Sequence, residues 1–319
     1  MRLRKICILG GSGFVGRHIA HTLIEQGYVV RIPTRRRERH RDLLVLPTLE
    51  LIEADIHNPQ TLAGLFKGCD AVINLAGILN EKGHDGSGFD FTHVQLPHKV
   101  VKACAASGIK RLLHMSALNA DATHGPSHYL RSKGRGEDLV HNAPGLRVTS
   151  FRPSVIFGPE DSFFNRFAKL LKITPVFFPL ACPNARFAPV YVDDVAQAFC
   201  RALTEPASYG MRYDLCGPRV YTLRQLVEYT AHIIGVKRFI LELSDRTSRL
   251  QARVFEYLPG KLFSMDNYRS LQKDSVCRGA VPLPFDLTPT PLEAVVPIYL
   301  AEQRSKTRYF DYRRAAGRR

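Results

Sequence analysis

The stretch ILGGSGFVGRHIAHTLIEQGY, residues 8–28, decides the fold. It places a short apolar run before Gly10, Gly13 and Gly16, and an amphipathic helical pattern after them. Glycines in such a strand-turn-helix unit allow a tight turn, close approach of backbone to a pyrophosphate, and close packing of helix on strand. The free N–H groups at the helix start favour the same anion. We therefore expect a dinucleotide to contact the loop residues Gly10, Ser12, Gly13, Phe14, Val15 and Gly16.

Strand and helix patterns continue to alternate up to about residue 150. Apolar runs such as KICILG, YVVRIP and AVINLAG are separated by helical patterns, of which residues 14–27 and 91–107 are two. Alternation of this kind is typical of parallel strands joined by helices that cover both faces of the sheet. The predicted fold is α/β, a Rossmann-type doubly wound parallel sheet with a smaller C-terminal substrate lobe.

Proline-rich connections become frequent beyond Pro153, and the regular alternation weakens there. We expect a dinucleotide-binding core over residues 1–155 and a smaller substrate lobe over 156–300. Elements near 186–204 are expected to return to the core, and residues 301–319 form a basic tail.

The end of the second predicted strand indicates which dinucleotide binds. An NAD site commonly has an acidic residue here for the ribose 2′-hydroxyl, whereas arginine accommodates a 2′-phosphate. The sequence IPTRR offers Arg35 and Arg36, and no acid appears before Glu38. NADP(H) is therefore the expected cofactor, and NAD(H) is the alternative. The other interpretation of these arginines is a solvated loop that binds no nucleotide.

Asp55 and Ile56 follow the third predicted strand, at the same edge of the sheet. The Asp55 carboxylate can accept a hydrogen bond from an adenine amino group. It can equally serve a turn before Asn58 and Pro59, which are typical of a helix start. Both interpretations stay open.

Composition limits the other classes of function. The formal charge of +16 favours an anionic ligand or surface, but no nucleic-acid motif accompanies the basic clusters. The seven cysteines form no CxxC pair and no Cys/His ligand cluster, so no metal site is predicted. No apolar run reaches the roughly 18 residues that a membrane-spanning helix needs. We expect a cytoplasmic protein, peripheral at most on the inner face of a membrane.

Tyr129 and Lys133 lie four residues apart in HYLRSKGRGE, so they share one face of a predicted helix. Ser116 ends the fifth predicted strand, where ligands bind in parallel sheets. A free phenol titrates near pH 10, and an ammonium about 4 Å away can stabilise the phenolate by at most roughly 4 kcal/mol, which is about three pKa units. Tyr129 then reaches the range of general acid/base catalysis.

Motifs along nearly the whole chain resemble those of extended and atypical short-chain dehydrogenase/reductases: GGSGFVG, VINLAG, YLRSK, FRPSVIFGPED and FAPVYVDDVAQAF. Within that superfamily, SALNAD, YLRSKGRGE, FGPEDSFFNRFA and GPRVYTL are most similar to the nucleotide-binding accessory subunits of respiratory complex I and their bacterial relatives.

The resemblance implies roles for further residues. Asn74, Leu75, Ala76 and Gly77 would line the ribose side, and Pro153 to Val155 would lie near the nicotinamide. The Tyr129 position would transfer the proton, the Lys133 position would hold the ribose, and the Ser116 position would orient a carbonyl.

Where many relatives have asparagine, this chain has His93. The imidazole either maintains a proton relay with altered geometry or is a structural histidine with satisfied hydrogen bonds.

The segment 290–314 combines basic side chains with apolar ones, which suits an anionic bilayer or a partner protein. Its apolar residues are Leu292, Val295, Val296, Tyr299, Leu300, Tyr309, Phe310 and Tyr312. A solvated basic tail is the alternative.

Three functions remain open. The first is an NADP(H)-dependent oxidoreductase acting on a small carbonyl, alcohol or quinone-related compound. The second is a non-catalytic nucleotide-binding subunit or assembly partner of a respiratory or quinone-biosynthetic complex. The third is a nucleotide-sugar epimerase or dehydratase, which only the extended fold supports.

Overall fold

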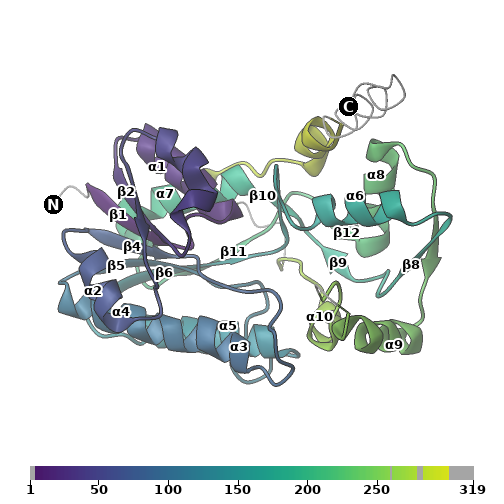
Figure 1. Ribbon diagram of the computed structural model, residues 1–319, viewed down its shortest axis with the longest axis horizontal. Helices are drawn as coiled ribbons and strands as arrows, with labels where there is room; N and C mark the ends of the chain where they lie inside the picture. The colour runs from purple at the N-terminus through teal and green to yellow at the C-terminus, as the bar shows by residue number, and fades with distance from the viewer. Residues whose placement is uncertain (1–3, 259–260, 279–282, 302–319) are drawn as a thin grey trace. The chain divides into compact units, whose positions relative to one another are not determined.

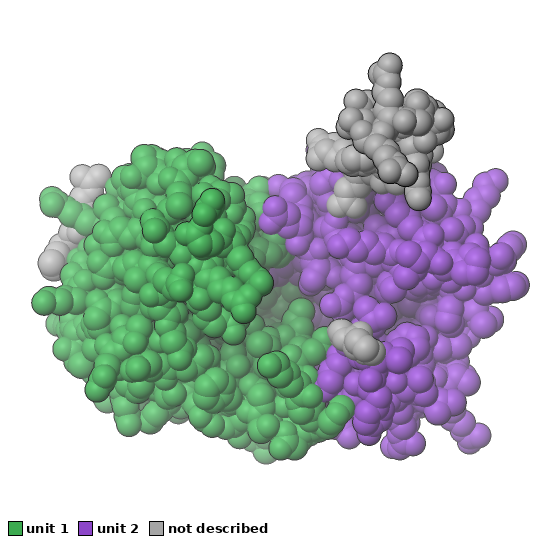
Figure 2. All heavy atoms as spheres, viewed as in Figure 1, with its two compact units in different colours: residues 1–154, 192–215, 277–288 green, residues 155–191, 216–276, 289–319 purple. Residues whose placement is uncertain are grey.

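The computed structural model describes residues 4–258, 261–278 and 283–301, and its contacts divide the chain into two compact units (Figure 2). Unit 1 comprises residues 1–154, 192–215 and 277–288, and unit 2 comprises 155–191, 216–276 and 289–319. The first boundary follows Ser154, and the returning segment is 192–215, where the sequence placed it near 186–204. The sequence did not predict that the chain returns to unit 1 a second time, at residues 277–288.

Unit 1 contains a seven-stranded parallel sheet in the order β11-β6-β5-β4-β1-β2-β3 (Figure 1). The strands are β1 (Lys5–Leu9), β2 (Val29–Thr34), β3 (Leu49–Glu53), β4 (Ala71–Asn74), β5 (Arg111–Met115), β6 (Arg147–Pro153) and β11 (Arg212–Leu215). Strands β4 and β5 are buried along their whole length, as expected for a sheet covered on both faces. The predicted α/β fold is confirmed, and β11 extends the sheet by a strand that was not predicted.

Helices cover both faces of this sheet. α1 (Phe14–Glu25) packs on α7 (Val192–Thr204) on one face, and α2 (Pro59–Phe66), α4 (Leu96–Ala106) and α5 (His128–His141) lie on the other (Figure 1). Shorter elements are η1 (Arg37–Val45), α3 (Ser87–Asp90), η2 (Phe91–Gln95), η3 (Pro206–Ser208) and η4 (Pro284–Asp286). The helix predicted over 91–107 is therefore two elements, since η2 is a π-helical turn before α4.

Unit 2 has its own hydrophobic core, formed mainly by aromatic and aliphatic side chains of α6 (Phe164–Ile173) and α8 (Leu223–Ile234). Its strands pair two by two, β7 with β10, β9 with β12 and β8 with β13. The remaining elements are β7 (Ile156–Phe157), β8 (Phe177–Leu180), β9 (Arg186–Phe187), β10 (Val190–Tyr191), β12 (Tyr221–Thr222), β13 (Phe239–Glu242), α9 (Asp245–Glu256) and α10 (Met265–Leu271).

A helical stretch at residues 292–301 completes that core. Leu292, Val296, Tyr299 and Leu300 are buried in it, because their spacing places them on one helix face. The Tyr299 hydroxyl donates to Asp161 Oδ2 at 2.7 Å. These four side chains are therefore not available to a membrane or a partner, contrary to our expectation for the segment 290–314. Tyr309, Phe310, Tyr312 and the rest of the tail 302–319 lie outside the described residues.

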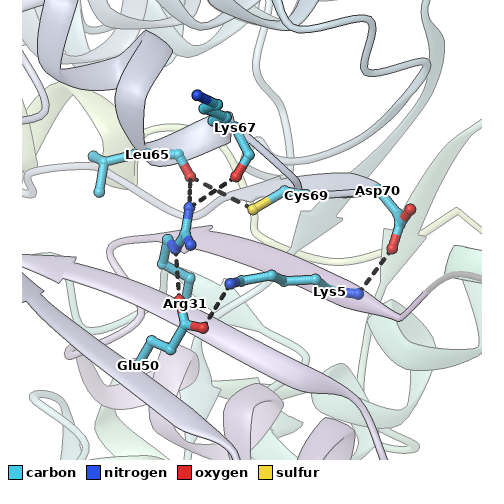
Figure 3. Close-up of polar contacts among 7 residues, drawn as sticks. All are labelled: Lys5, Arg31, Glu50, Leu65, Lys67, Cys69 and Asp70. Atoms are coloured by element: carbon cyan, nitrogen blue, oxygen red, sulfur yellow. Dashed lines mark hydrogen bonds and ion pairs between the residues drawn. The ribbon is translucent and has the colours of Figure 1, made fainter.

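A charged network joins β1, β2 and β3 (Figure 3). Glu50 accepts from Lys5 Nζ at 2.5 Å and from Arg31 Nε at 2.8 Å. Arg31 Nη1 also donates to the carbonyls of Leu65, at 2.7 Å, and Lys67, at 3.1 Å. Burial raises the pKa of Glu50, but the two cationic donors outweigh it and hold that pKa below its ordinary value. Arg31 is thus a structural residue, although it belongs to the arginine-rich sequence 31–41.

The interface between η2 and α5 depends on glycine. A Cβ at Gly136 would lie 1.9 Å from the carbonyl oxygen of His93, and one at Gly134 would lie 2.3 Å from the Ala122 nitrogen. Real Cβ atoms do not approach backbone so closely, so the backbone would have to shift. The two glycines of KGRGE therefore let α5 lie directly against its neighbours.

His93 is fully hydrogen-bonded at this interface. Its Nε2 accepts from the Ile78 N–H at 3.1 Å, and its Nδ1 lies 2.9 Å from Ser132 Oγ. Ser132 Oγ donates onward to the Tyr129 carbonyl at 2.8 Å, which makes Nδ1 the protonated nitrogen. Burial, followed by the charge of Lys133, lowers the pKa of His93 to about 2. The imidazole is neutral at physiological pH, as the structural interpretation of His93 requires.

Replacing Gly136 by alanine should destabilise the fold by about 2 kcal/mol or more, because the new methyl group overlaps the His93 carbonyl. Urea denaturation measures the loss. Gly64→Ala in α2 is the matched control, since nothing lies within 4 Å of a Cβ there and alanine favours a helix by up to about 1 kcal/mol. Equal stability of the two variants would contradict the proposed close approach.

His93→Asn should make the fold less sensitive to acid. The unfolded histidine binds a proton below about pH 6.5 and the folded one does not, so wild-type stability falls as the pH drops below that value. The wild type should lose up to about 1.4 kcal/mol per pH unit more than the variant. Urea denaturation between about pH 7 and pH 5 measures both slopes. Identical slopes would show that His93 is protonated in the fold.

Candidate functional site

The glycine loop lies against the carboxyl end of β4. Gly10 has a φ of +78°, and a Cβ there would lie 3.1 Å from both Ala76 N and Leu75 C. A Cβ at Gly16 would lie 2.5 Å from Gly11 Cα, so α1 starts in contact with the loop. The N-cap of α1 is Gly13, so no side chain hydrogen-bonds the first N–H groups of the helix. A loop packed this tightly exposes backbone rather than side chains, which suits a phosphate ligand.

Arg35 and Arg36 follow β2 and are exposed. Neither guanidinium has a hydrogen bond or ion pair with any other residue in the described ranges. Arg17, by contrast, is engaged: it pairs with Asp42 and donates to the Ser12 carbonyl at 3.1 Å. Arg35 and Arg36 are therefore available to an anion at this edge of the sheet.

The end of β3 lies beside that of β2, because Ala54 N donates to the Thr34 carbonyl at 2.9 Å. Asp55 is exposed, and its Oδ1 accepts from the His57 N–H at 2.9 Å. This turn hydrogen bond leaves the second carboxylate oxygen to solvent, so the geometry is compatible with both interpretations of Asp55. Ile56 follows it, half-buried.

His57 is a residue that sequence reasoning missed. Its ring stacks on Phe91 at 4.1 Å, and its buried Nδ1 has no partner in the described structure. The Lys99 ammonium donates to the His57 carbonyl at 2.8 Å. Burial is the main cause that lowers the pKa of His57. With Asp55 and residues 58–60, it lines an open hollow at the end of β3.

Tyr129 and Lys133 lie on α5, whose start is fixed by Ser127: its Oγ accepts from Leu130 N at 3.1 Å. Lys133 is buried, and its Nζ donates to the Met115 carbonyl at 3.0 Å. Burial lowers the pKa of Lys133 to about 8, although the Glu137 carboxylate opposes the shift. A Cβ at Gly77 would lie 3.2 Å from Lys133 Nζ, so the ammonium reaches the end of β4.

The Tyr129 ring is half-buried and held by aromatic neighbours. It meets the ring of His93 edge-on at 5.5 Å and that of Phe89 at 5.9 Å. The side chain is therefore oriented by rings on η2 and α3 as well as by its own helix.

Ser116 is buried and donates to Glu137 Oε2 at 3.1 Å. Glu137, without solvent exposure, also accepts from Arg152 Nε at 3.0 and 2.9 Å. A buried carboxylate is stable only with such partners. The spacing of Glu137, four residues after Lys133 on α5, was a signal available in the sequence, since both lie on the face turned to the sheet.

The expected site residues thus fall into two groups within unit 1. Gly10, Leu75, Ala76, Gly77 and Lys133 converge at the ends of β1 and β4. Arg35 and Asp55 mark the ends of β2 and β3. Pro153 ends β6, where its carbonyl accepts from Leu118 N at 3.0 Å. Val155 belongs to unit 2.

No group of three or more His, Cys, Asp or Glu residues among the described positions is arranged to hold a metal ion. Over the same part of the chain, no helix combines the length and the apolar character required to cross a bilayer.

Two curated relatives extend over most of the chain. Mitochondrial NADH dehydrogenase (ubiquinone) 1 alpha subcomplex subunit 9 of Mus musculus is 31% identical over 90% of this chain and 77% of its own length. Ceramide reductase of Caulobacter vibrioides is 30% identical over 75% of this chain and 74% of its own length. The chain spans only about three fifths of the mitochondrial subunits of Dictyostelium discoideum and Neurospora crassa, at 61% and 60%.

The fold also matches solved structures. The Bordetella bronchiseptica enzyme WbmH in complex with NAD+ superposes with a TM-score of 0.68 at 21% identity, covering 94% of this chain and 98% of WbmH. Residues 6–216 match the model of the NAD dependent epimerase/dehydratase family. This match covers the glycine loop and the Tyr129/Lys133 helix. The chain belongs to the NAD-dependent epimerase/dehydratase family of extended short-chain dehydrogenase/reductases.

Proposed function

We propose that the chain is an NADP(H)-dependent oxidoreductase that acts on a carbonyl or alcohol group of a small or quinone-related compound. The observation that carries this proposal is the convergence of the glycine loop, Gly77 and the Lys133 ammonium at the ends of β1 and β4. The loop proposed to bind the cofactor and the helix proposed to carry the proton donor meet there. The name of the Caulobacter relative, a reductase, supports redox chemistry over simple binding.

The cofactor would be held by backbone at the glycine loop and by charge at the end of β2. The absence of side chains at Gly10 and Gly16 lets the loop lie against β4 and the start of α1, which supports a pyrophosphate bound by loop backbone. Arg35 would contact the 2′-phosphate, with Arg36 as the second cation, and Asp55 would accept from the adenine. Bound there, the nicotinamide would supply or accept the hydride.

Side chains of the protein would donate and accept the proton. Tyr129 would donate it to the carbonyl oxygen in reduction and accept it in oxidation, and Lys133 would hold a ribose hydroxyl and lower the Tyr129 pKa. At neutral pH most Lys133 side chains carry the required charge, because the pKa of Lys133 lies at about 8.

Ser116 would orient the substrate carbonyl, but its hydroxyl proton points to Glu137 in this structure. A serine has one donor and two acceptor sites. Contact with a carbonyl therefore requires the hydroxyl to rotate away from Glu137, whose remaining bonds to Arg152 are sufficient to keep the carboxylate paired.

A nucleotide-binding subunit without turnover is the second candidate, supported by the match to the mouse subunit over 90% of this chain. Contact with a respiratory complex, in part through residues 301–319, belongs to this second proposal, as does a position at the cytoplasmic face of a membrane. The family description keeps an epimerase or dehydratase as the third.

Tyr129→Phe should keep NADP(H) affinity and lose at least about a hundredfold in kcat, because it removes the proton donor and leaves the binding cradle intact. The assay is NADPH oxidation with a panel of ketones and quinones, together with calorimetry for nucleotide binding. Tyr257→Phe, at an exposed position of unit 2, is the control. Tight nucleotide binding without turnover by any variant, wild type included, would favour the subunit proposal.

Arg35→Ala should weaken NADP(H) binding by roughly tenfold to a hundredfold and leave NAD(H) nearly unchanged, because a charge-assisted hydrogen bond contributes about 1.5–3 kcal/mol. Calorimetric titration of both nucleotides measures the ratio. The exposed Arg39, replaced by alanine, controls for the general basic charge of the segment. Equal losses for the two nucleotides in Arg35→Ala would contradict a contact with the 2′-phosphate.

A further inference from the structure

Unit 2 displays a cluster of exposed apolar side chains that its core does not use. Ile173, Val176, Phe177, Phe239 and Leu241 are 77%, 47%, 63%, 70% and 53% exposed, respectively. We refer to these five residues as the outer apolar face. Soluble proteins rarely display contiguous apolar patches without a binding function.

Strand pairing brings Val176, Phe177, Phe239 and Leu241 together, and Ile173 precedes them at the end of α6. β8 and β13 run parallel with Phe239 opposite Phe177 and Leu241 opposite Pro179, and Phe239 N donates to the Val176 carbonyl at 3.0 Å. The rings of Phe177 and Phe239 are 5.9 Å apart. Alternation along β8 turns Phe178 and Leu180 into the core, so Phe177 projects from the opposite side.

Lysines accompany the outer apolar face. Lys169 lies one helical turn before Ile173 on α6, Lys172 directly precedes Ile173, and Lys237 lies two residues before Phe239. All three are exposed, and within the described residues none of their ammonium groups forms an ion pair. The nearest acidic side chain along β13, Glu242, is already paired with Arg224. The surface is therefore apolar and positively charged.

We propose that the outer apolar face docks on an anionic lipid bilayer, with Phe177 and Phe239 entering the interface and Lys169, Lys172 and Lys237 contacting the headgroups. Apolar side chains beside lysines match the chemistry of a bilayer surface, where hydrophobic burial and attraction to anionic lipid act together. Phenyl rings that project this far enter a fluid interface without needing a matching cavity.

A second copy of the chain fits this face less well. A two-fold dimer places the same patch of both subunits face to face, so the lysines of both copies would gather at one interface. The formal charge of +16 adds to this repulsion. An anionic bilayer instead neutralises the lysines.

Vesicle co-sedimentation of the full chain tests the proposal. Binding to phosphatidylcholine vesicles containing phosphatidylglycerol should exceed binding to pure phosphatidylcholine at least about tenfold and should decrease with salt. The double variant Phe177→Ser/Phe239→Ser and the triple variant Lys169→Gln/Lys172→Gln/Lys237→Gln should each lose about tenfold or more of this binding. Unchanged thermal unfolding would show that each variant is folded.

The control variant is Val220→Ser/Ile298→Ser, two exposed apolar positions of unit 2 where the neighbouring Arg219 is paired with Glu293. It should bind like the wild type. Equal losses in the control and in the phenylalanine variant would overturn the proposal, as would a wild type that does not bind anionic vesicles. Light scattering completes the test, since a wild-type dimer that the phenylalanine variant converts to monomer would assign the face to a second copy.

Discussion

α5 can lie directly against its neighbours only because two of its residues have no side chain. Gly134 and Gly136 let α5 touch the backbone of residues 121–122 and of His93, at distances that no Cβ would permit. This approach places Lys133 Nζ against Met115 and Gly77, and Tyr129 beside the rings of His93 and Phe89. The geometry of the candidate site thus depends on how closely these two glycines let α5 pack, and not only on Tyr129 and Lys133 themselves.

The sequence was sufficient for the parallel sheet and the glycine loop, because hydrophobic runs and glycine spacing are local signals. It could not reveal the π-helical turn of η2, since that turn arises where His93 accepts the Ile78 N–H and contacts α5. The strand β11 was also missed, because Arg212–Leu215 is only four residues long and gains its place by pairing with β6. Tertiary contacts, not local preference, decide both elements.

In the candidate site, too, some features follow from local sequence and others depend on tertiary contacts. The spacing of Tyr129 and Lys133 predicted that both lie on one helix. The hydrogen bond from Ser116 to Glu137 depends on how the strand and the helix pack, which the sequence does not state. The ion pair of buried Glu137 with half-buried Arg152 fixes this carboxylate beside the serine. The apolar residues of the segment 292–301 were misjudged for a related reason, since an amphipathic pattern does not state whether a protein core or a membrane covers its apolar face.

The network around Arg31 changes how the basic charge of the chain should be counted. Arg31 shares Glu50 with Lys5, and Arg17 pairs with Asp42, while Arg35 and Arg36 keep their charge toward solvent. Among the described residues, the unpaired positive charge near the glycine loop therefore lies at the end of β2 and in Arg37 and Arg39, which directly follow it. A field focused in this way attracts anions before they make contact. The rate at which a phosphorylated ligand associates, and not only its affinity, should therefore depend on ionic strength.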